Sequence, residues 1–136
     1  MKHFKLTSET NINTLGIKLF RIECIIDCKW AKVGDKGGWI EKENNLFGDA
    51  WVYGDACVYG NAKVSGNADY CCFQAFGSDN RTTTVFKTPD GVRIKCGCFD
   101  GSLDAFVKQV EKTHGDNKFG REYRAIIEVI KAKFDL

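Results

Sequence analysis

Three residues in the C-terminal half of the chain have side chains suited to metal binding or catalysis. Cys96 and Cys98 flank a single glycine, and His114 follows them. Thiolate and imidazole groups are common zinc ligands, so a mixed site of these three residues is one interpretation. None of the cysteine spacings has the two-residue gap of common zinc motifs, however. We therefore interpret the seven cysteines as small apolar side chains in a reducing compartment, and expect no metal and no cofactor.

The same residues contain the groups needed for nucleophilic catalysis. His114 with Asp116 and either Cys96 or Cys98 has the residue types of a base, an orienting acid and a nucleophile. The segment around His114 also reads as a helix end, with a histidine near the negative end of the helix followed by Gly and Asx residues. Because proximity in sequence is no evidence of catalytic geometry, we expect no enzyme and name no catalytic residue.

Basic and aromatic side chains form a second candidate site, for an anionic ligand or a partner. Arg93 and Lys95 alternate onto one face of a predicted strand, and Arg81 and Lys87 flank or lie on the same hairpin. Arginine forks bind phosphate and aromatic rings stack on bases, whereas the alternative is a solvated sheet face. The residues proposed for ligand or partner binding are Trp51, Tyr53, Tyr59, Arg81, Phe86, Lys87, Arg93 and Lys95.

A six-residue repeat occupies the middle of the chain and should position part of this site. The units GDAWVY, GDACVY, GNAKVS and GNADYC begin at Gly48, Gly54, Gly60 and Gly66, and alanine recurs at 50, 56, 62 and 68. An apolar side chain stands at every sixth place from Ile40 to Phe76. Neither a helix of period 3.6 nor a flat strand of period two keeps glycine, alanine and valine at three separate phases.

This pattern resembles the hexapeptide-repeat family, whose members fold as a left-handed β-helix. The resemblance implies a short left-handed β-helix of about two coils over residues 40–76, with the repeated valines inside and Phe47, Trp51, Tyr53 and Tyr59 outside. Acyltransferases of this family use a histidine as general base, but His3 and His114 both lie outside the repeat. Two coils leave the ends of the prism uncovered, so we expect caps from the flanks or from other copies of the chain.

The flanking segments predict the remaining elements. Residues 17–26 alternate as a strand, and Pro89–Gly91 is a turn between strands over residues 82–88 and 92–98, which together form a β-hairpin. Ser102 is a helix cap for residues 103–113, and a second helix runs from about 119 to 134. The expected fold is therefore mainly β with C-terminal helices. Its parts are an N-terminal strand and cap (1–39), the β-helix (40–76) and a hairpin–helix–helix subdomain (77–136).

Parts of the chain also resemble small hexapeptide-repeat proteins of bacteriophages and prophages. The resemblance rests on KLFRI…GDKGGWIEKE with GDAWVYGDA, and on VRIKCGCFDGSLDAF with THGDNKFGREY. It implies a bacterial host cell. Because the first residues do not form the apolar segment of a signal peptide, we expect a cytoplasmic location in that cell. The net charge of +2 gives no reason to expect DNA binding, and no apolar run has the length of a membrane span.

Three functions follow as hypotheses. The first is a non-enzymatic accessory protein that binds a host factor, as an anti-defence inhibitor that blocks a host immune protein or sequesters a nucleotide signal. The second is a structural oligomerisation or virion-associated module, and the third is an acyltransferase-like enzyme. A homo-oligomer, trimeric or higher, is expected because a short repeat needs covered ends.

Overall fold

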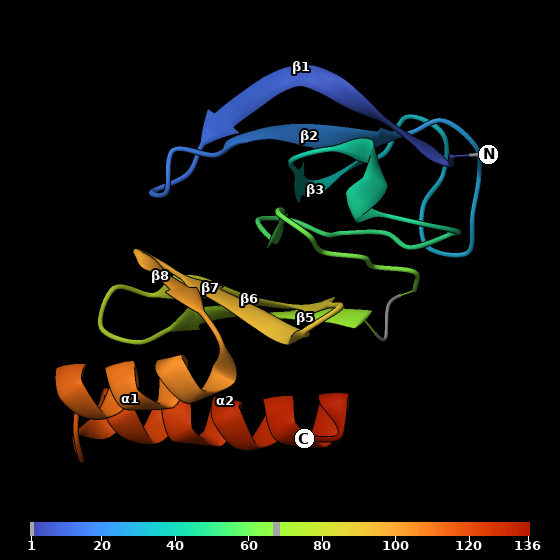
Figure 1. Cartoon of the computed structure of the whole chain (residues 1–136). Helices are drawn as coiled ribbons and strands as arrows, with labels where there is room; N and C mark the ends of the chain where they lie inside the picture. The colour runs from blue at the N-terminus through green and yellow to red at the C-terminus, as the bar shows by residue number, and fades with distance from the viewer. Residues whose placement is uncertain (1, 67–68) are drawn as a thin grey trace.

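The computed structural model describes residues 2–66 and 69–136, and it consists of three layers (Figure 1). A first sheet with its connecting loops forms one outer layer, a second sheet lies in the middle, and two helices form the other outer layer (Figure 1). The second sheet is therefore covered on both faces, which places any site on it at one of two junctions.

The first sheet is built from the N-terminal part of the chain. An antiparallel hairpin of β1 (Phe4–Ile12) and β2 (Lys18–Cys24) pairs through β2 with β3 (Lys36–Ile40), and β3 pairs in parallel with the short β4 (Cys57–Val58). The predicted strand over residues 17–26 is confirmed by β2, but β1 was not recognised as a strand because most of its side chains are polar or exposed. A short 3-10 turn, Glu43–Asn45, follows β3.

Our prediction of a left-handed β-helix over residues 40–76 is wrong. The described residues form two four-stranded sheets and two C-terminal helices. Between Leu46 and Gly66 the structure has only the two-residue strand β4 and one isolated bridge, from Leu46 to Val64. The repeat is too short to supply a stack of rungs, and residues 70–76 pair instead with the longer β6 (Arg81–Thr88) as the antiparallel strand β5 (Tyr70–Phe76).

The repeated apolar residues nevertheless form the core of the N-terminal half. Five side chains spaced six residues apart are fully buried: Ile40, Leu46, Val52, Val58 and Val64. Tyr70 is also buried, but Phe76 is 36% exposed, so the register of burial ends inside β5. The alanine of the fourth repeat, Ala68, lies outside the described residues.

Two of the aromatic residues expected outside are inside. Trp51 is 2% exposed and Tyr59 is fully buried. The indole of Trp51 packs on the backbone of Gly37, where an added Cβ would lie 2.8 Å from the ring and 2.6 Å from the Val52 carbonyl oxygen. Glycine is thus required at position 37 for this close approach. All three tryptophans of the chain, Trp30, Trp39 and Trp51, belong to this N-terminal half.

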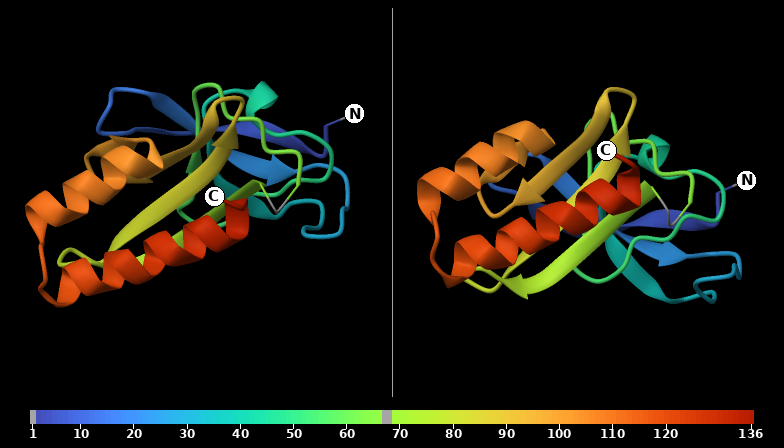
Figure 2. Two further views of the ribbon diagram at one scale, coloured as in Figure 1. Left: turned by 60° about the horizontal axis from the view of Figure 1, so that its bottom comes forward. Right: turned by 90° about the horizontal axis from the view of Figure 1, so that it is seen from below.

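The second sheet and the helices confirm the predicted C-terminal elements. Strand β6 pairs antiparallel with β7 (Gly91–Cys96), and β7 pairs with the three-residue β8 (Phe99–Gly101) that the sequence did not indicate. Helices α1 (Leu103–Thr113) and α2 (Lys118–Phe134) both lie across one face of this sheet (Figure 2). None of the described helices is long and apolar enough to cross a membrane.

Each face of the second sheet has its own core. Phe86 and Tyr70 face the N-terminal half and join its core. Val85 and Ile94 face the helices, where they pack with apolar side chains from α1 and α2. Because successive side chains of a strand point to opposite faces, neighbours such as Val85 and Phe86 serve different cores.

Candidate functional site

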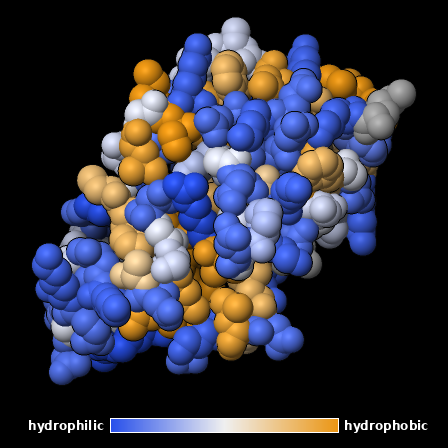
Figure 3. Space-filling model, viewed as in Figure 1, coloured by the Kyte–Doolittle hydropathy of each residue, from blue (hydrophilic) through white to orange (hydrophobic). Residues whose placement is uncertain are grey.

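A cavity of about 490 Å³ opens between the second sheet and the helices, and we call it the Arg81 cavity. Its apolar wall is Phe99, Phe106, Val110 and Tyr123, and its polar residues are Arg81, Cys96, Cys98, Asp100, Gln109, Thr113 and His114. In the space-filling view, hydrophobic surface is visible where the helices meet the sheet, bordered by hydrophilic side chains (Figure 3).

The caps of the two helices and the turn between them position the helical residues that line the cavity. The Ser102 hydroxyl oxygen caps α1 by accepting a hydrogen bond from the Ala105 amide (3.2 Å), and the Asn117 side chain caps α2 in the same way. Between the helices, Gly115 has a φ of +56°, and its carbonyl oxygen packs so closely on Gly120 that a Cβ there would overlap it. This tight turn places His114 at the end of α1 against Tyr123 of α2.

The aromatic wall is a continuous series of ring contacts. The ring centroids of Phe99 and Phe106 lie 5.2 Å apart. Those of Phe106 and Tyr123 lie 5.8 Å apart in an edge-to-face arrangement, and the Tyr123 ring stacks on His114 with a centroid distance of 5.6 Å. Tyr123 is further fixed because its hydroxyl lies on the Cα of Gly77, where a Cβ would overlap it. These rings hold one another in place, so the wall is formed without a ligand.

Arg81 is held at the cavity by a glycine turn. Gly97, between β7 and β8, has a φ of +57°, and an added Cβ would overlap the Arg81 guanidinium. The guanidinium donates to the Asp79 carboxylate at 2.7 Å, and the two side chains are 42% and 62% exposed. An ion pair this exposed contributes at most about 1 kcal/mol, so another anion can replace Asp79 at little cost.

The groups considered for catalysis reach the same region but do not form a catalytic triad. The Cys96 thiol accepts a hydrogen bond from the Thr83 hydroxyl (3.1 Å) and lies 3.6 Å from the Tyr123 hydroxyl oxygen. The Asp116 carboxylate is fully exposed and contacts Arg124 at 3.5 Å. Among the described residues, no group of three or more His, Cys, Asp or Glu side chains is placed to hold a metal ion.

Arg93 and Lys95, predicted to bind a ligand, have partners within the protein. Arg93 forms a two-point ion pair with Asp100, with the Arg93 Nε at 2.7 Å from Oδ1 and the Arg93 Nη2 bonded to Oδ2. The ammonium of Lys95, a residue only 9% exposed, donates to the Gly97 carbonyl oxygen. Both side chains point toward the N-terminal half, away from the helices.

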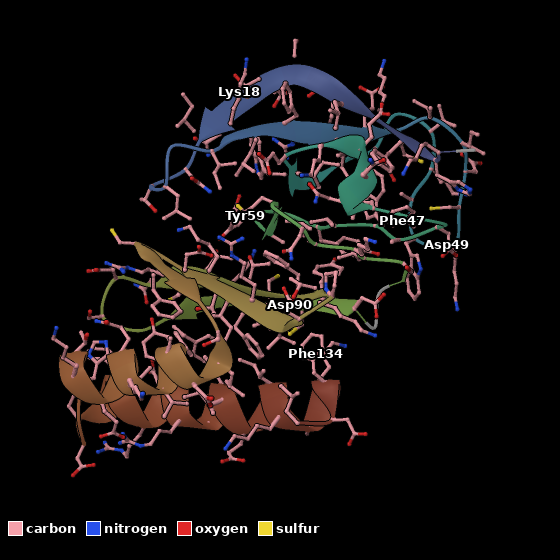
Figure 4. All side chains as sticks on the ribbon, viewed as in Figure 1. Lys18, Phe47, Asp49, Tyr59, Asp90 and Phe134 are labelled. Carbon is pink, nitrogen blue, oxygen red and sulfur yellow. The ribbon has the colours of Figure 1, made fainter. Side chains whose placement is uncertain are left out.

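Tyr59 completes a polar cluster at this second junction, which we call the Arg93 cluster: Tyr59, Arg93 and Asp100. The Tyr59 hydroxyl donates to Asp100 at 2.6 Å, and the Arg93 guanidinium lies over the Tyr59 ring at 4.9 Å. Figure 4 shows Tyr59 between the first and second sheets. Burial alone would raise the pKa of the Asp100 carboxyl, but hydrogen bonds from Arg93 and Tyr59 outweigh it and lower that pKa.

The other proposed binding residues are dispersed. Phe86 is fully buried and touches Tyr59 edge to face at 5.2 Å. Trp51 is buried in the N-terminal core, whereas Tyr53 is 43% exposed and its hydroxyl donates to the Trp30 carbonyl oxygen (3.5 Å). Lys87 lines a separate hollow of about 450 Å³ near the C-terminus. The eight residues therefore do not form one site, and only Arg81 lines the main cavity.

Most residues of the cavity wall were not predicted to belong to a site. Phe106, Gln109, Thr113 and Tyr123 lie within the two predicted helices, and the sequence pattern singled out none of them for binding. The available signal was the pair of segments Cys96–Cys98 and Thr113–Asn117, which place unusual residues at a strand end and a helix end. Which strand end meets which helix end is set by packing, so the pair could be recognised only in the structure.

Comparison of the chain with protein-family models, with curated proteins and with solved structures gives no match. The candidate site therefore rests on its own geometry.

Proposed function

We propose that this protein is a non-catalytic binding protein that holds a small organic anion in the Arg81 cavity. The observation that carries the proposal is the combination of a preformed aromatic wall with one replaceable guanidinium. Small-molecule cavities typically have about 300–1,000 Å³, and the Arg81 cavity, at about 490 Å³, lies within that range. Its lining combines an aromatic wall with several polar side chains.

Binding without catalysis is supported by the partners of the reactive groups. The Cys96 sulfur already accepts a hydrogen bond from Thr83, and Asp116 points to Arg124 rather than orienting His114. A nucleophile needs a base within hydrogen-bond reach and a group that orients the base. In the phage setting that the sequence resemblance implies, the role we propose is sequestration of a metabolite or signal of the host cell.

A cavity-filling variant tests the proposal. Gln109 is exposed on α1 and lines the cavity, so Gln109→Trp fills the cavity without disturbing the core. Lys108→Trp, one residue earlier and also exposed, adds the same side chain outside the cavity as a matched control. A thermal-shift screen of the wild-type protein against a metabolite library should find at least one anionic compound that raises the melting temperature. At 100 times Kd, binding adds about 2.7 kcal/mol of stability.

The shift should disappear in Gln109→Trp and persist in Lys108→Trp. If no compound stabilises the wild-type protein, or if the stabilisation survives Gln109→Trp, the cavity is not a binding site.

A further inference from the structure

A group of exposed apolar side chains lies on the loop between β2 and β3, which we call the Trp30 loop (residues 25–35). Its side chains Ile25, Trp30 and Val33 are between 40% and 62% exposed. Tyr53 lies beside them, because its hydroxyl donates to the Trp30 carbonyl oxygen. The loop is at the end of the first layer that also holds the N-terminus (Figure 1). Apolar side chains gathered on an exposed surface mark a place of contact with a partner or a membrane.

Hydrogen bonds within the protein hold the backbone of the Trp30 loop. The Gly34 amide donates to the Cys24 carbonyl oxygen at 2.9 Å and closes the base of the loop. Further along, the Val33 amide donates to the Asp27 carboxylate at 2.8 Å. An amide without a partner is costly in an apolar environment, so these bonds lower the cost of moving the loop into a membrane interface.

The positive charges of the Trp30 loop all belong to lysines. Lys29 and Lys32 are exposed, and neither forms an ion pair with any described residue. The Lys29 ammonium lies over the Trp30 ring at 4.9 Å. The two aspartates of the loop, Asp27 and Asp35, accept hydrogen bonds from its own amides. The lysine ammonium groups are therefore the charges left to meet an anion outside the protein.

This mixture of side chains favours a membrane surface over a protein partner. Protein interfaces are enriched in arginine and depleted in lysine, and the loop has no arginine. At a membrane surface, Trp and Tyr rings lie at the level of the lipid headgroups. Lysines there keep their ammonium groups in water while their stems cover apolar groups, as Lys29 covers Trp30. Anionic lipids attract such lysines.

We propose that the Trp30 loop docks the protein on an anionic phospholipid surface. Ile25, Trp30 and Val33 enter the headgroup region, and Lys29 and Lys32 lie against the lipid phosphates. The loop lies on one leaflet and does not cross it. This docking goes beyond the proposed function and does not depend on the Arg81 cavity.

Co-sedimentation of the full chain with vesicles tests the proposal. Vesicles of phosphatidylglycerol and phosphatidylcholine in equal amounts should bind it at least about tenfold more tightly than vesicles of phosphatidylcholine alone. Val33→Ser should weaken binding to the anionic vesicles about fivefold, because it removes an exposed apolar side chain from the loop. Ile12→Ser removes a side chain of similar exposure, 66%, from the end of β1 and should leave the binding unchanged.

A pair of double lysine variants tests the electrostatic part. Lys29→Gln with Lys32→Gln should weaken binding to the anionic vesicles at least about tenfold, because each lysine near an anionic surface contributes separately. Lys108→Gln with Lys112→Gln removes the same charge from exposed positions of α1, and should weaken binding by less than about twofold.

Tryptophan emission gives a second measurement. On anionic vesicles it should move to shorter wavelength, and the shift should be absent in Trp30→Phe, which keeps Trp39 and Trp51. Three results overturn the proposal: no binding to anionic vesicles, equal binding to phosphatidylcholine vesicles, or binding that Val33→Ser and the Lys29 and Lys32 double variant leave intact. A dimer of the free protein that Val33→Ser dissociates also overturns it, because a second copy would then cover the loop.

Discussion

The two faces of the second sheet use arginine in opposite ways. On the face toward the N-terminal half, Arg93 is paired at two points with Asp100, whose side chain is only 13% exposed, and it lies over the ring of Tyr59. On the helix face, Arg81 has an exposed aspartate as partner and an aromatic cavity beside it. The comparison teaches that residue type and charge do not separate a structural arginine from a binding one; the exposure of the carboxylate that pairs with it does.

The largest expected effect on stability comes from removing the Arg93 guanidinium, and removing the Arg81 guanidinium is the comparison. Arg93→Met leaves the Asp100 carboxylate buried without its main partner, and should lower the free energy of unfolding by about 3 kcal/mol. Arg81→Met removes an exposed pair and should change it by less than about 1 kcal/mol. Urea denaturation of the two variants measures the difference, and equal losses would show that the comparison is mistaken.

Removing the tyrosine hydroxyl should also cost more stability at the Arg93 cluster than at the Arg81 cavity. Tyr59→Phe deletes a 2.6 Å hydrogen bond to a carboxylate, and should cost about 2 kcal/mol of unfolding free energy. Tyr123→Phe deletes only contacts of 3.5 and 3.6 Å, and should cost less than about 1 kcal/mol. Thermal denaturation of both variants would reveal a reversed order if the Arg93 cluster were not stabilising.

Alanine substitutions at two glycines with nearly equal positive φ distinguish an effect on stability from an effect on ligand binding. Gly97 and Gly48 have φ of +57° and +58°, so an alanine at either position should cost about 1 kcal/mol of stability. Only Gly97→Ala places a methyl group where the Arg81 guanidinium lies, whereas the nearest atom to a Cβ at position 48 is 3.4 Å away. Ligand affinity, measured by calorimetry, should therefore fall in Gly97→Ala and stay unchanged in Gly48→Ala.

The smallest expected effect is on how the free energy of unfolding falls at acidic pH. Because the folded pKa of Asp100 lies below its ordinary value of 3.8, its contribution is fully present above that value and is lost as the pH falls through the folded pKa. Asp100→Asn should flatten the fall in stability below about pH 4. Chemical denaturation at a series of pH values from 3 to 7 would compare the variant with the wild-type protein, and an unchanged slope in Asp100→Asn would contradict this prediction.

Local signals in the sequence predicted local structure well. The turn Pro89–Gly91, the Ser102 cap and the helical pattern of residues 119–134 each depend on neighbouring residues, and the hairpin and both helices are confirmed. The six-residue repeat correctly indicated that the apolar side chains at every sixth place from Ile40 to Tyr70 are buried, but it wrongly placed Trp51 and Tyr59 outside. It did not indicate the fold, because burial every sixth residue leaves open which strands pair, and β5 found its partner in β6.

The candidate site was less predictable for the same reason. Arg81 was named for its charge, but its place beside Gly97 depends on a contact between the start of β6 and the β7–β8 turn. Arg93 and Lys95 were named for the face they share, and that face is covered by the N-terminal half rather than by solvent. Charge and periodicity identify the available side chains, whereas the packing of distant segments decides which of them stay accessible.

The position of the tryptophans has a consequence for following the protein in solution. Trp51 and its two fellow indoles all belong to the N-terminal half, while both helices lie beyond the second sheet. Tryptophan fluorescence therefore reports on one outer layer, and the far-ultraviolet circular dichroism signal of the helices reports on the other. The protein therefore has two intrinsic optical probes, one on each side of the second sheet. If the unfolding transitions followed by the two probes coincide, the two halves unfold cooperatively; if they differ, the halves unfold separately.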